Sequence, residues 1–401
     1  MLSASARPYI DASVPVLREH GPSITRRFYA DLFAAEPALL DLFNTGNQAS
    51  GAQQGALASA LVAYAANIDD AAALAPVVER IAHKHASLGI QPAQYWTVGR
   101  YLLAAIQKVL GEAATPALLA AWDEAYWLLA TTLIAAEARL YAGAGDRAGA
   151  LRELVVSAVQ RESDNVVSYC LQTADGQSPG PFVPGQYVSV AVQLPSGQRQ
   201  LRQYSLSDAP GRPYWRITVQ RELARGERPE GTVSSLLHAG LKVGSRLAVG
   251  TPFGNFTPAL KRTRPLALLS AGVGVTPMIG VLNALAELGS AAPILFAHAA
   301  RDVSGLAFRG ELARAASSLP NLTSLAFCES LPEGSIGEGV QPGTMVLTRE
   351  QLAPFADADF YLCGPLEFMR AQWSALIGSG VSAARIQREV FGPDLLEHLL
   401  G

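Results

Sequence analysis

The chain has 401 residues, of which 49% are hydrophobic and 16% charged, and its formal net charge is −3. This composition is typical of a globular protein with roughly two or three domains that each bury a core, and it excludes a disordered chain. The near balance of charge, without a basic run, excludes an electrostatic surface for nucleic acid. The 3 cysteines are too scattered for a disulfide framework, and no secretory signal or apolar run of membrane-spanning length is visible, so a cytoplasmic location is expected.

Residues 1–142 are rich in Ala and Leu, and their apolar residues are spaced three and four apart. This spacing is typical of amphipathic helices and predicts an all-helical domain. Proline is favoured in the first turn of a helix, so helix starts are expected at Pro76, Pro92 and Pro116. A linker is expected at 143–146, where Gly-Ala-Gly-Asp follows the last helix.

One helix of this domain carries a histidine on its apolar stripe. The stripe consists of Leu74, Val77, Val78, Ile81, Ala82 and His85. His83 projects to a nearly opposite side of the same helix and is expected in solvent. A lone core-facing histidine usually bonds to a carbonyl and has only a structural role.

His85 does not stand alone, because the next helices place Tyr95 and Glu137 on their own apolar stripes. A buried carboxylate without a partner would be costly. We therefore expect the imidazole, the phenol and the carboxylate to hydrogen-bond to one another. The alternative is that Glu137 lies near a helix end and reaches water.

The pattern changes after the linker. From 150 to 262 short β-type runs alternate with Gly/Pro turns, which predicts an all-β domain. From 263 to 401 apolar strands alternate with helical stretches, which predicts an α/β domain with a parallel sheet. The expected organisation is therefore a multidomain chain: all-α at 1–142, all-β at 150–262 and α/β at 263–401.

A four-residue motif in the β domain places an arginine, an aromatic ring and a hydroxyl along one strand. Its residues are Arg202, Gln203, Tyr204 and Ser205. A guanidinium binds a diphosphate through paired hydrogen bonds, an aromatic ring stacks on a planar cofactor, and a hydroxyl reaches a ring nitrogen. The motif resembles the flavin-binding signature of the ferredoxin-reductase-like family.

Two further segments of this domain are candidates for the same cofactor. Pro184-Gly185-Gln186-Tyr187 precedes the motif and by itself is simply a turn. Gly231, Val233 and Ser234 belong to a loop that enters a short helix. Free amides at that helix start could bind a phosphate, although a plain Ser/Thr cap is an equally common explanation.

The α/β domain contains two loops that follow buried strands. The first comprises Gly272, Val273, Gly274, Val275, Thr276 and Pro277. Its glycines allow backbone amides to approach a diphosphate, and Thr276 is expected to cap the next helix, with Pro277 at the first helical position. This is not the full G-x-G-x-x-G fingerprint, because proline takes the third position. The second loop is Cys363-Gly364-Pro365, at the carboxyl edge where open α/β sheets bind ligands.

Taken in order along the whole chain, these motifs resemble the flavohaemoglobin (flavohemoprotein) family, in which a globin is fused to a ferredoxin-reductase-like FAD/NAD module. The resemblance implies that the β domain is an antiparallel barrel for FAD and that the α/β domain binds NAD(P). It also implies a haem b in the helical domain. The residues that this assigns to the haem are Phe43 on its face, Leu57 above the iron, His85 as the iron ligand, and the neighbouring Lys84.

The resemblance assigns catalytic roles to four residues. Tyr29 and Gln53 correspond to the hydrogen-bond donors of the distal side, and Tyr95 and Glu137 to the proximal pair that orients and polarises the histidine. In the reductase module it places Tyr187 near the flavin or adenine and Cys363 beside the nicotinamide, whereas a lone cysteine at such a position is more often a small core residue. The C-terminal match comprises Val390, Phe391, Gly392 and Pro393. Valine at 390 departs from the cysteine expected there, and Phe391 is expected by the flavin.

The function implied is an NAD(P)H-dependent nitric oxide dioxygenase that oxidises NO with O2 to nitrate, with electrons relayed by FAD to the haem. Alternatives are a diaphorase that reduces oxygen, ferric complexes or quinones, and a haem-based oxygen or NO sensor. The choice between NADH and NADPH stays open, because 297–302 offers both a base and an acid for the ribose. O2 and NO are the expected partners and a monomer is expected; whether lipid enters the distal pocket stays open.

Overall fold

The computed structural model describes residues 1–43, 46, 48, 51–224, 226, 229–331 and 340–392. It divides into two compact units. The first contains Met1–Leu151 with Ala191–Arg202 and the residues from Gly392 onwards, and the second contains Arg152–Val190 with Gln203–Phe391. The domain limits expected from the sequence remain a proposal. None of the helices in these described ranges is long and apolar enough to cross a membrane.

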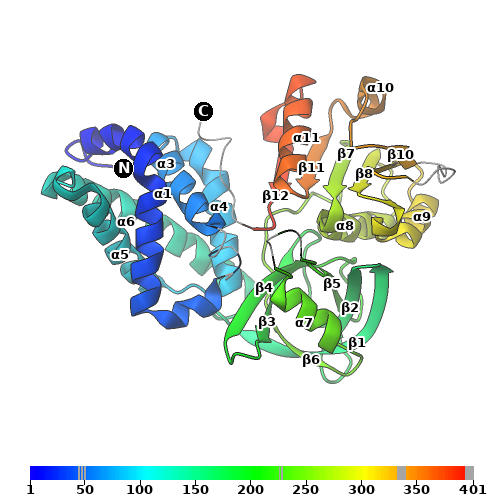
Figure 1. Cartoon of the computed structure of the whole chain (residues 1–401). Coiled ribbons are helices and arrows are strands. Elements are labelled where there is room, and N and C mark those ends of the chain that lie inside the picture. Colours follow the sequence, from blue (N-terminus) through cyan, green and yellow to red (C-terminus); the bar gives the residue numbers. More distant parts are fainter. Residues whose placement is uncertain are drawn as a thin grey trace. The chain divides into compact units, whose positions relative to one another are not determined.

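The N-terminal part is all-helical, as predicted (Figure 1). Its elements are α1 (Arg7–Ala35), η1 (Pro37–Leu42), α3 (Ala52–Ala66), α4 (Ala71–Leu88), α5 (Pro92–Leu110), η2 (Gly111–Ala113) and α6 (Pro116–Ala144). Helices α1, α3, α5 and α6 contribute to one buried apolar cluster. Its members include Ile10, Ile24, Leu32, Leu61, Ile106 and Trp122.

Prolines mark two of the three expected helix starts. Pro92 and Pro116 begin α5 and α6 as predicted, but Pro76 lies inside α4. The start of α4 is set instead by Asp70, whose carboxylate accepts a hydrogen bond from the Ala73 amide at 2.9 Å. The expected linker also begins later, because α6 runs on to Ala144.

The middle of the chain forms a six-stranded sheet in the order β4-β3-β6-β1-β2-β5. The strands are β1 (Leu151–Ser163), β2 (Val166–Gln172), β3 (Tyr187–Gln193), β4 (Arg199–Ser205), β5 (Trp215–Gln220) and β6 (Arg246–Gly250), accompanied by helix α7 (Thr232–Gly240). Strand β2 pairs antiparallel with both β1 and β5. An antiparallel bridge from Leu206 to Ile217 joins the residue after β4 to β5, so the two ends of the strand order meet. This closure agrees with the predicted antiparallel barrel.

The C-terminal part is a parallel six-stranded sheet in the order β10-β9-β8-β7-β11-β12. Its strands are β7 (Leu266–Ala271), β8 (Ile294–Ala300), β9 (Leu322–Cys328), β10 (Val340–Pro342), β11 (Asp359–Cys363) and β12 (Ile386–Glu389). The central strands are almost wholly apolar because helices cover both faces of the sheet.

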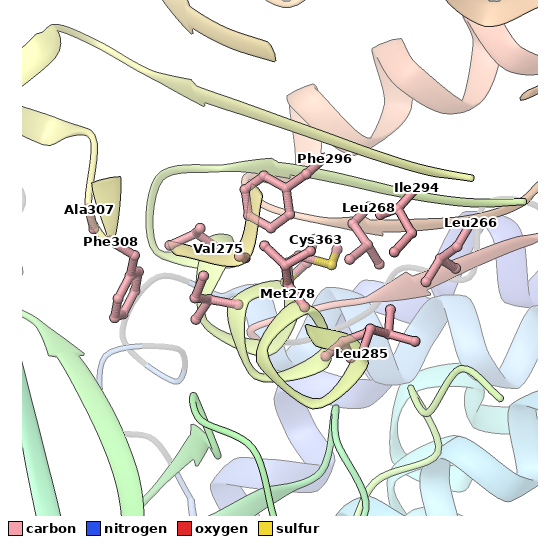
Figure 2. Packing of buried hydrophobic residues seen from close by; sticks show 14 of the residues in the cluster. Leu266, Leu268, Val275, Met278, Leu285, Ile294, Phe296, Ala307, Phe308 and Cys363 are labelled. Carbon is pink, nitrogen blue, oxygen red and sulfur yellow. The ribbon is translucent and has the colours of Figure 1, made fainter. Parts of the chain in front are cut away.

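Helices of the parallel-sheet part lie on opposite faces of its sheet (Figure 1). The helical elements are η3 (Gly272–Gly274), α8 (Val275–Glu287), η4 (Val303–Gly305), α9 (Arg309–Ser318), α10 (Arg349–Leu352), η5 (Ala353–Phe355), α11 (Leu366–Gly378) and η6 (Ala383–Arg385). Residues of α8 and α9 pack on one face and residues of α11 on the other. Figure 2 shows Met278 and Leu285 of α8 against Leu268, Phe296 and Cys363 of the sheet.

Candidate functional site

A histidine, a tyrosine and a glutamate from α4, α5 and α6 meet in the first unit. His85 Nδ1 lies 2.9 Å from the Tyr95 hydroxyl and 2.8 Å from Glu137 Oε1. The Tyr95 hydroxyl also donates to Glu137 Oε1. Glu137 is only 2% exposed, so the alternative that it reaches water is wrong. The structure thus brings together the three side chains that the apolar stripes predicted to meet.

This cluster determines which imidazole nitrogen remains available. A carboxylate beside Nδ1 favours the tautomer that carries its proton there, which leaves the lone pair on Nε2. Burial and the neighbouring Glu137 raise the pKa of Tyr95 well above its usual range, so the phenol stays protonated and donates. The His85 side chain itself remains 32% exposed, unlike its two partners. A partly open imidazole with Nε2 available fits a haem-iron ligand.

His83 differs from its expectation. It is half-buried rather than solvated, and this burial lowers the pKa of its imidazole. Lys84, between the two histidines, donates through Nζ to the Gly392 carbonyl at 3.3 Å, and both residues belong to the first unit.

A second polar pair lies within the apolar core of the helical part. Tyr29 on α1 is 5% exposed, and its hydroxyl accepts a hydrogen bond from Gln53 Nε2 at 3.3 Å. Burial raises the pKa of Tyr29 to about 12, so the hydroxyl is protonated at neutral pH. Because Gln53 donates to the oxygen, the hydroxyl hydrogen is directed to another acceptor. Phe43 packs edge-on against the Tyr29 ring at 5.8 Å, and Leu57 is part of the same cluster.

The four-residue motif lies on β4, as the strand pattern predicted. Arg202 Nη1 donates to Gln200 Oε1 at 3.0 Å and to the Leu201 carbonyl at 2.8 Å. Gln203 and Tyr204 are half-buried and Ser205 is buried. The motif therefore offers a guanidinium, a ring and a hydroxyl on a rigid strand, which fits FAD.

The other two segments expected near the flavin each lie beside a glycine. The ring of Tyr187, which is 7% exposed, lies against Gly254, where a Cβ would come within 3.0 Å of it. Gly231 precedes α7, and no side chain caps that helix. Instead the Ser234 hydroxyl donates to the Gly231 carbonyl at 3.0 Å. The Ser/Thr-cap explanation of this loop is therefore wrong, and Val233 packs in the core as the helix begins.

The two loops of the parallel sheet lie against each other. A Cβ on Gly274 would come within 2.2 Å of the Cys363 carbonyl oxygen, and one on Gly364 within 3.1 Å of the Ala271 amide. At Gly274 only glycine permits this approach of two backbones, and at Gly364 a side chain would be tightly packed. Because β7 and β11 are neighbours, both loops lie at the carboxyl edge of the sheet, which fits a dinucleotide diphosphate.

The expected cap of α8 is wrong. The helix begins at Val275 rather than Pro277, so Thr276 lies inside its first turn. The Thr276 hydroxyl donates back to the Val273 carbonyl at 3.0 Å, and Gly272, with φ 55°, makes the preceding turn. The amides at the start of α8 are consequently not occupied by a side-chain cap.

Other predicted residues are placed less directly. The Cys363 side chain is fully buried among Val275 and Met278, and burial raises the pKa of its thiol, so only its backbone faces the loop (Figure 2). The Pro365 backbone precedes α11 as its N-cap. Val390 is half-buried and Phe391 is 48% exposed. Pro393 lies outside the described residues.

Within 297–302, at the end of β8, the histidine carries no charge. His298 is 4% exposed, its Nδ1 lies 3.0 Å from the Ser270 hydroxyl, and burial lowers its pKa to about 4. A neutral imidazole contributes no charge toward a 2′-phosphate. Asp302 accepts from the Gly305 amide at 3.0 Å and thereby shapes the turn that follows the strand.

Sequence reasoning missed a buried ion pair, Arg216–Glu311, with 2.5 Å between Nη1 and Oε1. The signal was present, since Arg216 interrupts the apolar strand Trp215–Gln220. The partner could not be inferred, because it lies on α9 about a hundred residues later.

Comparison with known proteins covers all three parts. Residues 26–133 match the globin family, 153–257 the oxidoreductase FAD-binding domain and 268–373 the oxidoreductase NAD-binding domain. The flavohemoprotein of Rhizobium meliloti is 42% identical over 402 residues, covering 98% of this chain and 99% of the relative. That of Bordetella parapertussis is 45% identical over 403 residues with the same coverage. The chain belongs to the flavohemoprotein family.

Solved structures agree with this membership. The flavohemoglobin of Malassezia yamatoensis, with bound FAD and haem, is 32% identical and superposes with a TM-score of 0.84, covering 98% of this chain and 100% of that one. The FAD/NAD-binding domain of a nitric oxide dioxygenase from Vibrio cholerae is 36% identical with a TM-score of 0.55, covering 60% of this chain and 99% of that one. This flavohemoprotein is thus an oxidoreductase whose cofactors are haem, FAD and a nicotinamide dinucleotide.

Proposed function

We propose that this flavohemoprotein is an NAD(P)H-dependent nitric oxide dioxygenase that converts NO and O2 to nitrate. The observation that carries the proposal is the His85–Tyr95–Glu137 cluster, in which a buried phenol and a buried carboxylate contact a partly exposed imidazole. A carboxylate hydrogen-bonded to an iron-ligating imidazole makes the histidine a stronger electron donor to the metal. Oxygen storage does not need such a donor, whereas oxygen activation does. The Vibrio cholerae neighbour, whose matched part is the reductase portion, is itself described as a nitric oxide dioxygenase.

The distal residues support the same reading. Tyr29 is held by Gln53 with its hydroxyl protonated, inside an otherwise apolar cluster. A preorganised donor in a dry environment stabilises negative charge that develops on a bound ligand, without having to reorganise. Leu57 and Phe43 pack against this cluster and add to its apolar surface.

Bound haem would supply the iron chemistry, and FAD would accept hydride from the nicotinamide and release electrons singly. The chain's own contribution is binding and orientation. His85 would hold the iron through Nε2, with Lys84 beside it. The flavin would be held by Arg202, Gln203, Tyr204 and Ser205, by Gly231, Val233 and Ser234, and by Tyr187. The dinucleotide would be held by the loops 272–277 and 363–365, and the tail residues Val390, Phe391, Gly392 and Pro393 complete the proposed set.

The decisive test is aerobic NAD(P)H-dependent NO consumption with nitrate quantified. We expect the wild-type holoprotein to convert NO to nitrate in equal amounts, and His85→Ala to lose nitrate formation. Loss is expected because no other residue of the cluster presents a nitrogen to the iron. Flavin reduction by NAD(P)H should continue in that variant. NAD(P)H turnover that persists undiminished in a His85→Ala protein lacking haem would favour the diaphorase instead.

Tyr29→Phe separates an enzyme from a gas sensor. Both should release O2 faster when the donor is lost. Only the dioxygenase should also lose nitrate output at low oxygen. An oxygen off-rate that changes while nitrate output stays constant would contradict the proposed role of Tyr29. A cytoplasmic location and O2 and NO as substrates complete the proposal.

A further inference from the structure

A buried ion pair joins the barrel to the parallel-sheet part within the second unit. Arg216 on β5 is 5% exposed and Glu311, in the first turn of α9, is 7% exposed. The two are bidentate, with 2.5 Å from Nη1 to Oε1 and 2.9 Å from Nη2 to Oε2. Two parallel hydrogen bonds fix the relative orientation of the groups as well as their distance.

Neighbouring polar groups extend this pair into a network. Asn283 of α8 donates to Glu311 Oε2 at 2.7 Å and to Asp208 Oδ1 at 2.9 Å. The Tyr214 hydroxyl donates to Asp208 Oδ2 at 2.9 Å, and Arg216 Nη2 donates to the Ser207 carbonyl. The network therefore links the barrel to both α8 and α9.

The contact between the two parts is not filled by apolar packing at this point. A solvent-open pocket of about 460 Å³ lies there, and all the network residues except Ser207 line it. The orientation of α9 against the barrel consequently depends here on directional polar contacts. None of these residues belongs to the proposed haem, flavin or diphosphate sites.

Arg216 also supports a strained residue. Phe308 immediately precedes α9 with φ 61°, and it is the one non-glycine residue with positive φ in the described part of the chain. Such a conformation is strained for a bulky residue and persists only where the surroundings hold it. The Arg216 guanidinium lies 5.2 Å from the centre of the Phe308 ring. Figure 2 shows Phe308 beside Ala307 at one end of the apolar cluster.

Residues 301–308 connect the carboxyl end of β8 to α9. The equivalent segment of a dinucleotide-binding sheet contacts the adenosine ribose. Asp302 lies in this segment and shapes its turn. A group that fixes Phe308 and Glu311 therefore fixes the end of the segment that would hold the adenosine half of the dinucleotide.

We propose that the Arg216–Glu311 pair orients the β8–α9 segment against the barrel, so that a dinucleotide bound by its adenosine half presents its nicotinamide to the flavin. Arg216 and Glu311 are positioning residues in this scheme and do not touch the reacting atoms. The proposal rests on NAD(P)H oxidation through FAD and not on nitric oxide dioxygenation. Its test therefore reads flavin reduction alone.

The experiment is anaerobic stopped-flow reduction of the FAD in the holoprotein, with wild type compared with Glu311→Gln. Two reductants are used: NADH, and reduced nicotinamide mononucleotide, which lacks the adenosine half. With NADH, Glu311→Gln should lower the second-order rate constant of flavin reduction by about tenfold or more, because the buried Arg216 loses its bidentate carboxylate and keeps Asp208 only at 3.8 Å. With the mononucleotide the same variant should stay within about twofold of wild type.

A matched control joins the same two parts. Arg212 and Glu287 form an exposed ion pair, 2.5 Å apart and 44% and 41% exposed. An exposed pair contributes little, so Glu287→Gln should stay within about twofold of wild type with both reductants. Arg216→Lys, which keeps the charge but not the paired hydrogen bonds, should give an intermediate loss with NADH.

FAD content and the melting temperature of each variant accompany the kinetics. If Glu311→Gln fails to retain FAD, Arg216→Lys carries the test. Equal losses with NADH and the mononucleotide would overturn the proposal, since a general structural defect affects both. An NADH rate constant within twofold of wild type in Glu311→Gln, or in Arg216→Lys where that variant carries the test, would also overturn it.

Discussion

The role of Glu137 depends on the groups that surround it. Its Oε1 is bonded to both His85 and Tyr95, and its Oε2 is buried without a hydrogen-bond partner among the described residues. Burying a carboxylate in this way destabilises the folded state. Its electrostatic effect on His85 is a functional reason for keeping it there.

Glu137→Gln removes the charge but keeps the volume and one oxygen acceptor. We expect NO turnover to fall by roughly 10- to 100-fold, the range typical when an outer partner of a metal-bound histidine is changed. The iron–histidine stretching frequency in resonance Raman spectra should fall as well, because the imidazole becomes a weaker donor. Asp123→Asn, at an exposed position on the same helix, is the control and should change neither quantity. An unaltered frequency in Glu137→Gln would contradict the electronic role.

The raised pKa of Tyr29 predicts how the stability of the helical part depends on pH. Its pKa is raised from 10.0 to about 12. The folded state therefore holds the phenolic proton more tightly than the unfolded state. The associated stability is fully present below pH 10 and is lost as the pH rises through about 12.

The test follows thermal unfolding of the haem part by Soret absorbance at pH 8 and near pH 12. Between these two pH values, Tyr29→Phe should lose less stability than wild type. The difference should be on the order of 2–3 kcal/mol, since each pKa unit corresponds to about 1.4 kcal/mol. Tyr9→Phe, at a position 41% exposed on the same helix, should leave the pH dependence unchanged. Identical curves for wild type and Tyr29→Phe would mean that this phenol does not titrate as inferred.

At the scale of elements, the helix starts show where local rules are sufficient and where they are not. Pro92 and Pro116 begin helices, as their fixed φ allows, whereas Pro76 is preceded by a stronger local signal in Asp70. The start of α8 shows the converse case. No side-chain cap marks this start. The geometry there is decided by Gly274, which immediately precedes the helix and contacts the loop after β11.

Gly274→Ala tests this contact. The added Cβ would lie 2.2 Å from the Cys363 carbonyl, where only backbone could move away. We expect the KM for NAD(P)H to rise and the melting temperature to fall, because the two loops must separate. Gly378→Ala, in α11 with open space around the added Cβ, is the control and should leave both unchanged. A Gly274→Ala protein with wild-type KM would show that the loop approach does not position the dinucleotide.

For the whole molecule, the chemistry is divided between two compact units. The proximal cluster lies in the first and the Arg216–Glu311 network in the second. Substitutions that share no partners should have independent effects.

The doubly substituted protein Glu137→Gln/Glu311→Gln should therefore show each defect unchanged. Flavin reduction by NADH should match that of Glu311→Gln, and the iron–histidine frequency should match that of Glu137→Gln. The free-energy changes should add to within about 0.5 kcal/mol. A flavin-reduction rate that depended on residue 137 would indicate coupling between the units that these contacts do not provide.

Much of the fold and of the candidate site could be inferred from the amino-acid sequence, because the informative signals were local. Helical spacing placed His85, Tyr95 and Glu137 on facing stripes, strand alternation located the Arg202 motif, and glycine-rich turns marked both dinucleotide loops. Local patterns of this kind survive folding because burying an apolar stripe or face leaves the backbone little choice.

Tertiary structure alone decided which distant groups meet. It paired Arg216 with Glu311, pressed Gly274 against Cys363, and turned the Cys363 thiol into the core. It also buried His298, which leaves this imidazole neutral. These outcomes depend on contacts between residues far apart in the chain and on the loss of solvent around them, so the local sequence can mark an unusual residue such as Arg216 but cannot identify its partner.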